Sequence, residues 1–170
     1  MKKKLLFPLI AAFLLVPWPI AYAFDSANAS NATVTITPAD ASVAPHIQAF
    51  GLAIGSVEPG ELFTVDTSGA GVDKQFSLCI TNTDEMVACY RYMTLNIGIY
   101  VRTNDGNWNK VTTAGGAVPD IYLTIQDGIV SFTLPADAFY KITIDKGCFY
   151  CYGNDKNGYI AAPDFNLTVD

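Results

Sequence analysis

Several residue types on which enzymes and nucleic-acid-binding proteins depend are scarce in this 170-residue sequence. There is one histidine, His46, and a single histidine is far more often structural or solvent-exposed than catalytic. No GxSxG, HExxH or phosphate-binding glycine motif occurs. The 16 acidic side chains outnumber the 10 lysines and arginines, which disfavours nucleic acid and anionic membranes as partners. We therefore expect no enzymatic activity, and a small secreted enzyme is only the third hypothesis.

The first 23 residues have the organisation of a secretory signal peptide. Lysines at positions 2–4 precede an apolar run over residues 5–16, and residues 21–23 (AYA) form a small-x-small cleavage site. An uncleaved anchor is the alternative, but the apolar run is short and prolines interrupt it. We expect a protein secreted to the extracellular space or cell surface. Its mature chain would start near Phe24, and loss of the three lysines takes the net charge from −6 to −9.

Apolar and polar residues alternate in two neighbouring segments, and a period of two is typical of strands with one buried face. The first segment contains Phe76, Leu78 and Ile80, and the second runs over residues 93–101 and is long enough to lie centrally. Shorter alternating segments occupy residues 33–37, 46–57, 62–65, 140–145 and 165–169. No segment longer than about eight residues has helical periodicity. The sequence predicts an all-β fold, an antiparallel β-sandwich of jelly-roll or immunoglobulin-like type.

Asp127-Gly128 lies between two apolar segments and predicts a two-residue type I′ turn. Such a turn would join residues 121–125 and 129–134 into a hairpin. Its register would place three apolar pairs on one face, namely Ile125 with Val130, Leu123 with Phe132, and Ile121 with Leu134.

Glycine and proline positions predict three further features of the chain path. Residues 46–57 mix apolar residues with glycines and suit one strand with a bend or bulge. Residues 58–61 (EPGE) have the pattern of a β-turn in which Gly60 takes a positive φ. At Asp105-Gly106, a strict two-residue loop would put Val101 opposite Lys110 on the core face, so we expect a longer loop or a bulge.

Four cysteines follow the signal segment, namely Cys79, Cys89, Cys148 and Cys151. An even number in an exported protein favours two structural disulfides, and three connectivities are open. The CxxC spacing of the last two is also found in redox-active dithiols, and four thiolates could hold zinc. No thioredoxin-like βαβ pattern surrounds the CxxC, which argues against the redox alternative.

Two kinds of ligand deserve consideration. Residues 104–107 and 154–157 cluster oxygen ligands in loops, but neither fits the EF-hand spacing and turn chemistry explains both. Calcium is thus an open candidate, and no other cofactor is predicted. Tyr90, Tyr92 and Tyr100 lie opposite the apolar series of their strand, where exposed rings could stack on carbohydrate or another subunit. Alternatively, both faces of this strand are buried.

Three sequons make Asn28, Asn31 and Asn166 candidate glycan acceptors. The first two fall in the segment 24–45, which we assign as a flexible extension of a β-sandwich domain over residues 46–170.

This extension contains a short strand that ends at Pro38 and is followed by a proline-flanked loop. The candidate strand comprises Ala32, Thr33, Val34, Thr35, Ile36 and Thr37. It could pair with its own sheet or complete the groove of a neighbouring subunit, which is donor-strand complementation. Because such a contact is head-to-tail and does not close, it would build a filament from copies of this chain.

Residues 57–95 resemble a pattern in the TasA/camelysin family, in which a PGD turn precedes a strand ending in Asn-Thr and a further strand. Here residues 57–61 read VEPGE, residues 76–83 read FSLCITNT, and residues 92–95 read YMTL. This chain has Glu61 in place of the usual Asp, lacks the glycine often found after Asn-Thr, and carries four cysteines. Family members that form biofilm fibres, and the related archaeal bundling pili, are jelly-roll subunits joined by an N-terminal donor strand. The resemblance implies a filament or matrix role without enzymatic activity.

The function predicted from the sequence is therefore a structural subunit of an extracellular filament or pilus that polymerises through its N-terminal strand. The alternative is a secreted monomeric carbohydrate- or calcium-binding β-sandwich module, with an internal first strand and an exposed aromatic platform.

Overall fold

The computed structural model describes residues 33–50, 54–152 and 161–170. The predicted signal peptide, Ala32, Asn28, Asn31 and the loop 154–157 lie outside the described residues. The elements are β1 Thr35–Pro38, β2 Ile47–Phe50, β3 Ile54–Val57, β4 Gly60–Asp66, β5 Lys74–Ile80, α1 Thr83–Cys89, β6 Tyr90–Arg102, β7 Trp108–Lys110, β8 Ile121–Thr124, β9 Ile129–Leu134, β10 Phe139–Cys151 and β11 Phe165–Val169. No helix among the described residues is long and apolar enough to cross a membrane.

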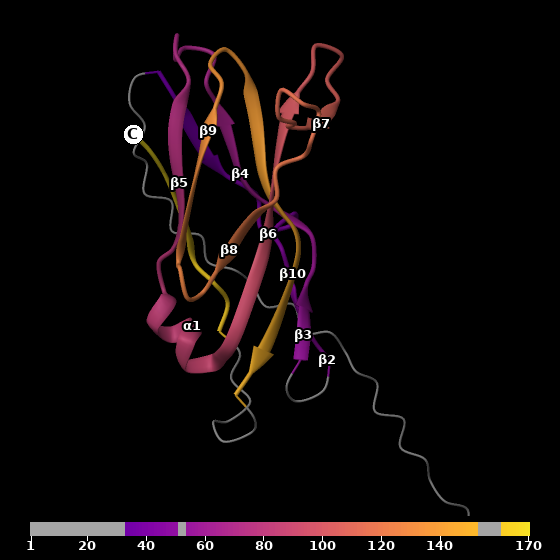
Figure 1. The fold of residues 1–170 in the computed structure, drawn as a ribbon, viewed down its shortest axis with the longest axis vertical. Helices are drawn as coiled ribbons and strands as arrows, with labels where there is room; N and C mark the ends of the chain where they lie inside the picture. The colour runs from indigo at the N-terminus through magenta and orange to yellow at the C-terminus, as the bar shows by residue number, and fades with distance from the viewer. Residues whose placement is uncertain (1–32, 51–53, 153–160) are drawn as a thin grey trace, which may run out of the picture.

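The strands form two antiparallel sheets that face each other across the core (Figure 1). The larger sheet, sheet A, contains β1, β2, β3, β4, β6, β7, β8 and β10, and sheet B has the order β11-β5-β9. The predicted all-β antiparallel sandwich is confirmed. The choice between jelly-roll and immunoglobulin-like types stays a prediction.

The long strands β6 and β10 pair along almost their whole length and form the centre of sheet A (Figure 1). β10 has β4 and then β3 on its other side, and β6 has β7 and β8. The central position predicted for residues 93–101 is thus confirmed, and Met93, Leu95 and Ile97 are buried as the alternation requires. The neighbouring alternating segment, β5, is not its partner, because α1 carries the chain across to the other sheet.

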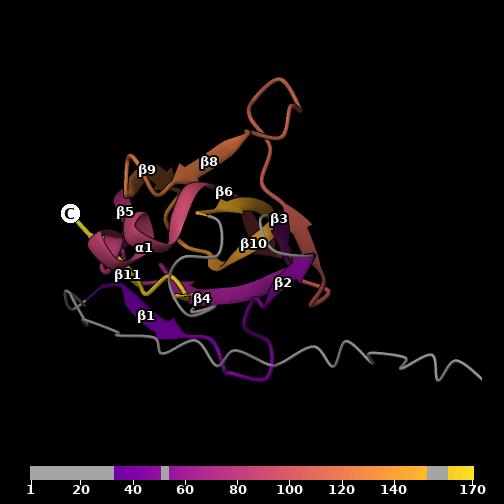
Figure 2. The ribbon, with the colours of Figure 1, turned by 90° about the horizontal axis from the view of Figure 1, so that it is seen from below.

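The predicted hairpin over residues 121–134 is wrong in its pairing. β8 pairs with β6 in sheet A, whereas β9 pairs with β5 in sheet B. Gly128 has the expected positive φ of 66°, but the turn passes from one sheet to the other (Figure 2). Leu123 and Leu134, predicted to share the core face, are both buried. The apolar residues therefore belong to two facing sheets, and not to one hairpin.

Two predictions about residues 46–61 are also wrong. In place of one bent strand, β2 and β3 are separate antiparallel strands, with Ile47 opposite Val57. In place of a reversing turn at residues 58–61, β3 and β4 follow one another along β10 in the same direction. Gly60 has no positive φ; a Cβ there would overlap the backbone of Ala44 and Pro45. Close approach of two backbones, and not turn geometry, is what requires this glycine.

The Asp105–Gly106 turn is longer than two residues, as expected. Thr103 N–H donates to the Asn107 carbonyl at 2.8 Å, and Gly106 has a φ of 86°. Tyr100, and not Val101, therefore lies opposite Lys110. This register keeps the lysine on the outer face of sheet A.

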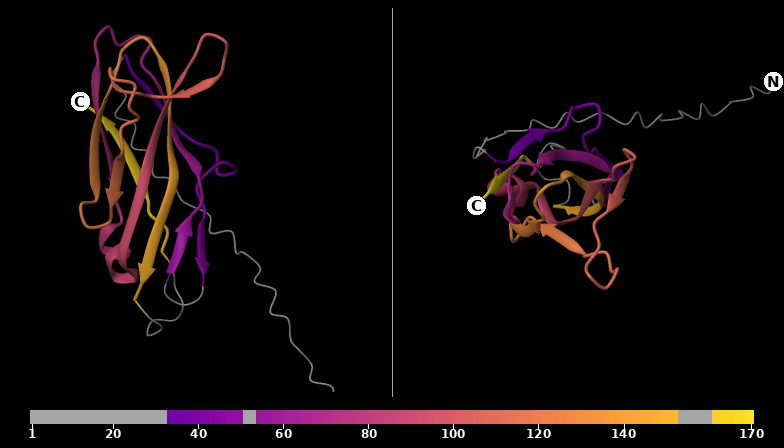
Figure 3. Two further views of the ribbon diagram at one scale, coloured as in Figure 1. Left: turned by 45° about the vertical axis from the view of Figure 1, so that its right-hand side comes forward. Right: turned by 90° about the horizontal axis from the view of Figure 1, so that it is seen from above.

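β1 pairs antiparallel with β4 of the same chain, at the edge of sheet A. It lies on the side of the sandwich that also carries β11, whereas the β8–β9 connection closes the opposite side (Figures 2 and 3). β1 and β2 lie in succession along β4 and β3, so both strands of the segment 35–50 run antiparallel to strands of the segment 54–66.

Candidate functional site

The candidate donor strand occupies a place in its own domain. Val34 and Ile36 are 2% and 7% exposed and belong to the core, while Thr35 and Thr37 face outward. After β1, residues 40–43 form an exposed turn held by the Asp40 carboxylate, which accepts from Ser42 N–H at 2.8 Å. Ala44 and Pro45 are again buried. The described part of the predicted extension therefore contacts the sandwich at two places separated by an exposed turn.

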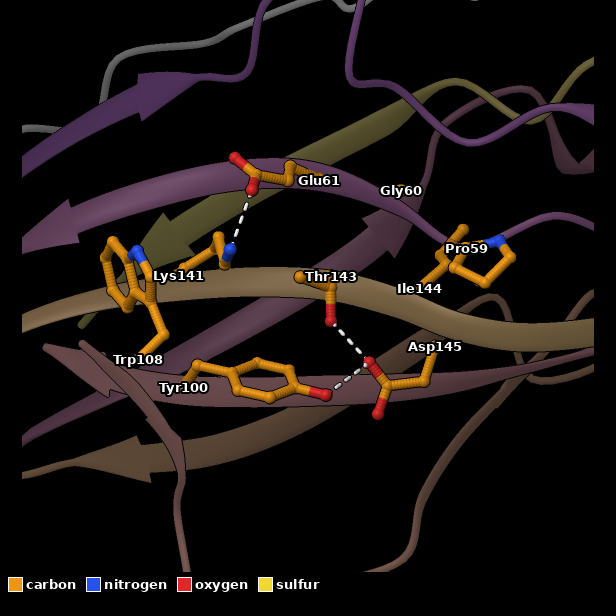
Figure 4. A pocket seen from close by; sticks show the side chains of 9 residues that line it. All are labelled: Pro59, Gly60, Glu61, Tyr100, Trp108, Lys141, Thr143, Ile144 and Asp145. Atoms are coloured by element: carbon orange, nitrogen blue, oxygen red, sulfur yellow. Dashed lines mark hydrogen bonds and ion pairs between the residues drawn. The ribbon is translucent and has the colours of Figure 1, made fainter.

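A groove of about 320 Å³ lies on the outer face of sheet A, the face turned away from sheet B (Figure 4). Its polar and aromatic lining comes from four strands and comprises Glu61 of β4, Tyr100 of β6, Trp108 of β7, and Lys141, Thr143 and Asp145 of β10. Lys141 and Tyr100 of this lining lie opposite each other in register, and Lys110, which is outside the lining, lies opposite Tyr100 on its other side. We call this the outer groove.

Asp145 is the main acceptor in the outer groove. Its carboxylate accepts from Thr143 Oγ1 at 2.7 Å, from the Tyr100 hydroxyl at 3.1 Å and from Lys110 Nζ at 2.5 Å. The ladder between β10 and β6 shifts between Ile144 and Lys146, so Asp145 is an extra residue at a β-bulge. A Cβ on Gly98 would overlap the side chains of Asp145 and Thr143, so a glycine leaves the space that this carboxylate occupies.

These contacts fix the charge states in the groove. Burial opposes ionisation of Asp145, but the hydrogen bonds from Lys110, Thr143 and Tyr100 outweigh it and hold the pKa of the carboxyl below its ordinary value. The hydrogen bond to Asp145 raises the pKa of Lys110. Burial, followed by the charge of Asp145, raises the pKa of Tyr100. All three groups keep their usual neutral-pH charge states, including an un-ionised tyrosine that donates.

In the other half of the groove, Lys141 contacts both a carboxylate and the aromatic rings. Its Nζ donates to Glu61 Oε1 at 2.7 Å and lies 4.9 Å from the Trp108 ring centre and 5.9 Å from that of Tyr100. Its side chain is only 17% exposed. Trp108 also packs against Phe139, with ring centres 5.9 Å apart. The ammonium is therefore held between a carboxylate and two aromatic faces, in a fixed position.

The predicted tyrosine platform is present only in part. Tyr90 is 1% exposed, and its hydroxyl donates to the Ala161 carbonyl at 2.6 Å, so its assignment to an exposed face is wrong. A register shift at the end of β10 places it opposite Cys151 and turns it inward. Tyr92 is 45% exposed, and Tyr100 is half-buried in the outer groove.

An exposed apolar row crosses three strands at the other end of the same face. Tyr150 lies between Tyr92 and Ile54 in register, and the three are 40%, 45% and 60% exposed. The Arg91 guanidinium lies 5.9 Å from the ring centre of Tyr150 and 5.6 Å from that of Tyr152. Sequence alternation identified Tyr92, but the row depends on strand pairing that the sequence does not reveal.

The four cysteines are free thiols, and no pair of them lies at disulfide distance. The prediction of two disulfides is therefore wrong. Cys148 and Cys151 are three residues apart on one extended strand, about 10 Å along the chain. That exceeds the Cα separation of about 7 Å that a disulfide tolerates. Cys79 lies on sheet B, while Cys89 ends α1, where its carbonyl accepts from Tyr152 N–H.

In the described part of the chain, no three His, Cys, Asp or Glu side chains come together to form a zinc or calcium site. Cys151 lies near Cys89, but no third cysteine joins them to form the zinc set considered above. The Asp105 carboxylate accepts from Thr103 Oγ1 and, at 2.8 Å, from Asn107 Nδ2. Its hydrogen bonds therefore stabilise the turn that contains it. His46 is an exposed residue outside the outer groove.

Asn166, the sequon residue within the described range, lies on β11 opposite Cys79. It is half-buried, and its Oδ1 is buried without a hydrogen-bond partner among the described atoms.

No protein-family model and no curated protein matches this sequence. The resemblance to the TasA/camelysin family therefore stays a prediction.

Proposed function

We propose that this protein is a structural subunit of an extracellular filament or pilus, and that its copies join head to tail by exchange of β1. The observation that carries the proposal is the combination of a buried terminal strand and an exposed turn after it. Val34, directly before β1, and Ile36 of β1 belong to the core, and residues 40–43 are the point at which the strand can separate from the domain.

The contacts of β1 are equally available within one chain and between two copies. Burial of Val34 and Ile36 contributes about 2 kcal/mol for each side chain. A subunit whose β1 has moved away therefore exposes an apolar strip beside β4, and the β1 of another copy fits it. Such pairing is head to tail, because the donor and acceptor surfaces of each copy are different, and it builds a filament when the rotation from copy to copy does not close a ring. Closure within the chain competes, so exchange depends on a high local concentration.

A disulfide that ties β1 to its own β4 tests this proposal without removing any core residue. Thr37 and Thr64 are opposite in register, and neither is buried. The Thr37→Cys, Thr64→Cys double variant of residues 24–170 is compared in its oxidised and reduced states, with the two single variants as controls. Size-exclusion chromatography with light scattering gives the mass.

We expect heat-stable polymers from the unsubstituted and reduced proteins, and monomers from the oxidised double variant. Polymers from the oxidised double variant would show that assembly does not use β1. Monomers under all conditions would reject the filament and leave the secreted monomeric binding module as the explanation.

A further inference from the structure

The outer groove has the size and chemistry of a small-molecule site. Its volume of about 320 Å³ falls at the lower end of the range for ligand pockets in proteins. It is formed by strands of the central sheet and not by long loops, so its side chains are held in place before any ligand arrives. Figure 4 shows Trp108 at one end, with Lys141, Tyr100 and Asp145 along its length.

The charges of the groove cancel. Lys110 pairs with Asp145, and Lys141 pairs with Glu61. An ionic ligand would gain no net attraction and would have to separate one of these pairs, which costs energy in a partly buried site. A neutral ligand can use the lone pairs of the carboxylates and the remaining N–H groups of the ammonium ions without disturbing either pair.

The aromatic residues add an apolar surface next to these polar groups. The Trp108 indole is half-buried at the edge of the sheet, and the Tyr100 ring lies between Lys110 at 5.8 Å and Lys141 at 5.9 Å. The positively charged ammonium groups are attracted to the negative faces of these rings, and this attraction holds the rings in position. A ligand that suits this arrangement has an apolar face for the indole and hydroxyl groups on its edge.

From these three features we infer that the outer groove binds a neutral saccharide, with one pyranose ring against Trp108 and its hydroxyl groups directed to Lys141, Glu61 and Asp145. This site is separate from the exchange of β1, and its test does not depend on polymer formation. A protein held monomeric by the Thr37–Thr64 cross-link is equally suitable for it.

The chain supplies its own reporter for this test. Its two tryptophans are Trp18, in the predicted signal peptide, and Trp108, so the protein from residue 24 onward has a single indole, which lies in the groove. Its fluorescence is titrated with methyl glucoside, methyl N-acetylglucosaminide and their β1,4-linked trimers. Glucuronate and glucosamine are the charged probes.

We expect a saturable change in emission with a neutral probe at a Kd of about 1 mM or below. Lys141→Met should weaken binding at least about tenfold, and Glu61→Gln should weaken it by a smaller factor. Tyr122→Ala is the matched control, because Tyr122 is 50% exposed on the same sheet but outside the groove, and it should bind as the unsubstituted protein does. Circular dichroism checks that each variant is folded.

Three results would overturn the inference. The first is no change in emission with any neutral probe at about 50 mM, fifty times the expected Kd. The second is glucuronate or glucosamine binding as tightly as the neutral probes. The third is an equal loss of binding in Tyr122→Ala and in folded Lys141→Met and Glu61→Gln.

Discussion

The two halves of the β6–β10 pair present different outer faces although they belong to the same two strands. In the groove half, residues 98–102 and 139–145, the outward side chains bond to one another, and Asp145 alone accepts from three donors. In the tyrosine half, residues 90–95 and 147–151, the outward rings of Tyr92 and Tyr150 are 45% and 40% exposed.

The flanking strands account for this difference. In the groove half, β4 and β7 bring Glu61 and Lys110 within reach of side chains on β10. In the tyrosine half, β3 and β8 bring Ile54 and Thr124, which offer no charged partner. Alternation along a strand thus decides which face a residue occupies, whereas the neighbouring strands decide whether that face is bonded internally or left open. Five predictions test this comparison.

The largest loss of stability is expected from a substitution at Gly60, where β4 begins beside the groove half. Gly60→Ala would force a Cβ into the backbone of Ala44 and Pro45, and should lower the free energy of unfolding by about 3 kcal/mol. Urea denaturation measures it. Gly115→Ala, in an open loop, is the control and should change stability by less than about 1 kcal/mol. Equal effects of the two substitutions would contradict the close packing at Gly60.

A smaller loss is expected from Gly98→Ala, at about 2 kcal/mol, because the new Cβ displaces Asp145 and Thr143. The displacement should also separate Asp145 from Lys110. Thr94→Ala, outward on the same strand but in the tyrosine half, should change stability by no more than about 0.5 kcal/mol. The comparison of the halves fails if both substitutions have the same effect in denaturation experiments.

Two tyrosines on one strand allow the same substitution in both halves. Tyr100→Phe removes the hydroxyl that donates to Asp145, and should cost about 1 kcal/mol. Tyr92→Phe alters an exposed ring and should change stability by only about 0.3 kcal/mol or less. Thermal and urea unfolding would measure both, and a larger cost for Tyr92→Phe would reverse our interpretation.

Acid should weaken the groove half through Asp145. Because the folded-state pKa of its carboxyl is lowered, its contribution is present above the unfolded pKa, about 3.9, and is lost as the pH falls through the folded value. The stability difference between the unsubstituted protein and Asp145→Asn should therefore stay constant above about pH 5 and shrink as the pH falls below about 4. Urea unfolding across this range measures it, and a difference independent of pH would contradict the role of this carboxylate.

The smallest structural effect concerns thiol reactivity in the tyrosine half. Cys148 is exposed, whereas Cys151 is half-buried, and burial raises the pKa of the Cys151 thiol. A maleimide at neutral pH should modify Cys148 first and Cys151 more slowly, with the Cys151 rate rising at higher pH. Mass spectrometry after timed quenching identifies the site. Faster labelling of Cys151 would place it at the surface.

The in-or-out position of most strand residues could be predicted from the sequence, but their partners could not. Leu123 and Leu134 are both buried as expected, yet they belong to different sheets, because the Asp127–Gly128 turn connects strands that diverge. A period of two gives the same pattern for a hairpin and for two strands that face each other across a core.

The outer groove shows the same limit. Alternation over residues 140–145 places Lys141, Thr143 and Asp145 on one side of their strand, but nothing in the sequence places Trp108 or Glu61 beside them. Pairing of β10 with β4 and β6 creates the site, across sequence separations that no local pattern records. The Asp145 bulge is equally invisible, because it depends on the register of the partner strand.

The central position of β10 determines when this chain can fold. β3, β4 and β6 all need β10 as a neighbour, and it begins only at Phe139. A chain that emerges from its N-terminus can close the local β2–β3 hairpin early, but sheet A cannot be completed until residues 139–151 have appeared. Such late, non-local pairing makes folding slow. A nascent chain would thus stay without its central sheet for most of its synthesis.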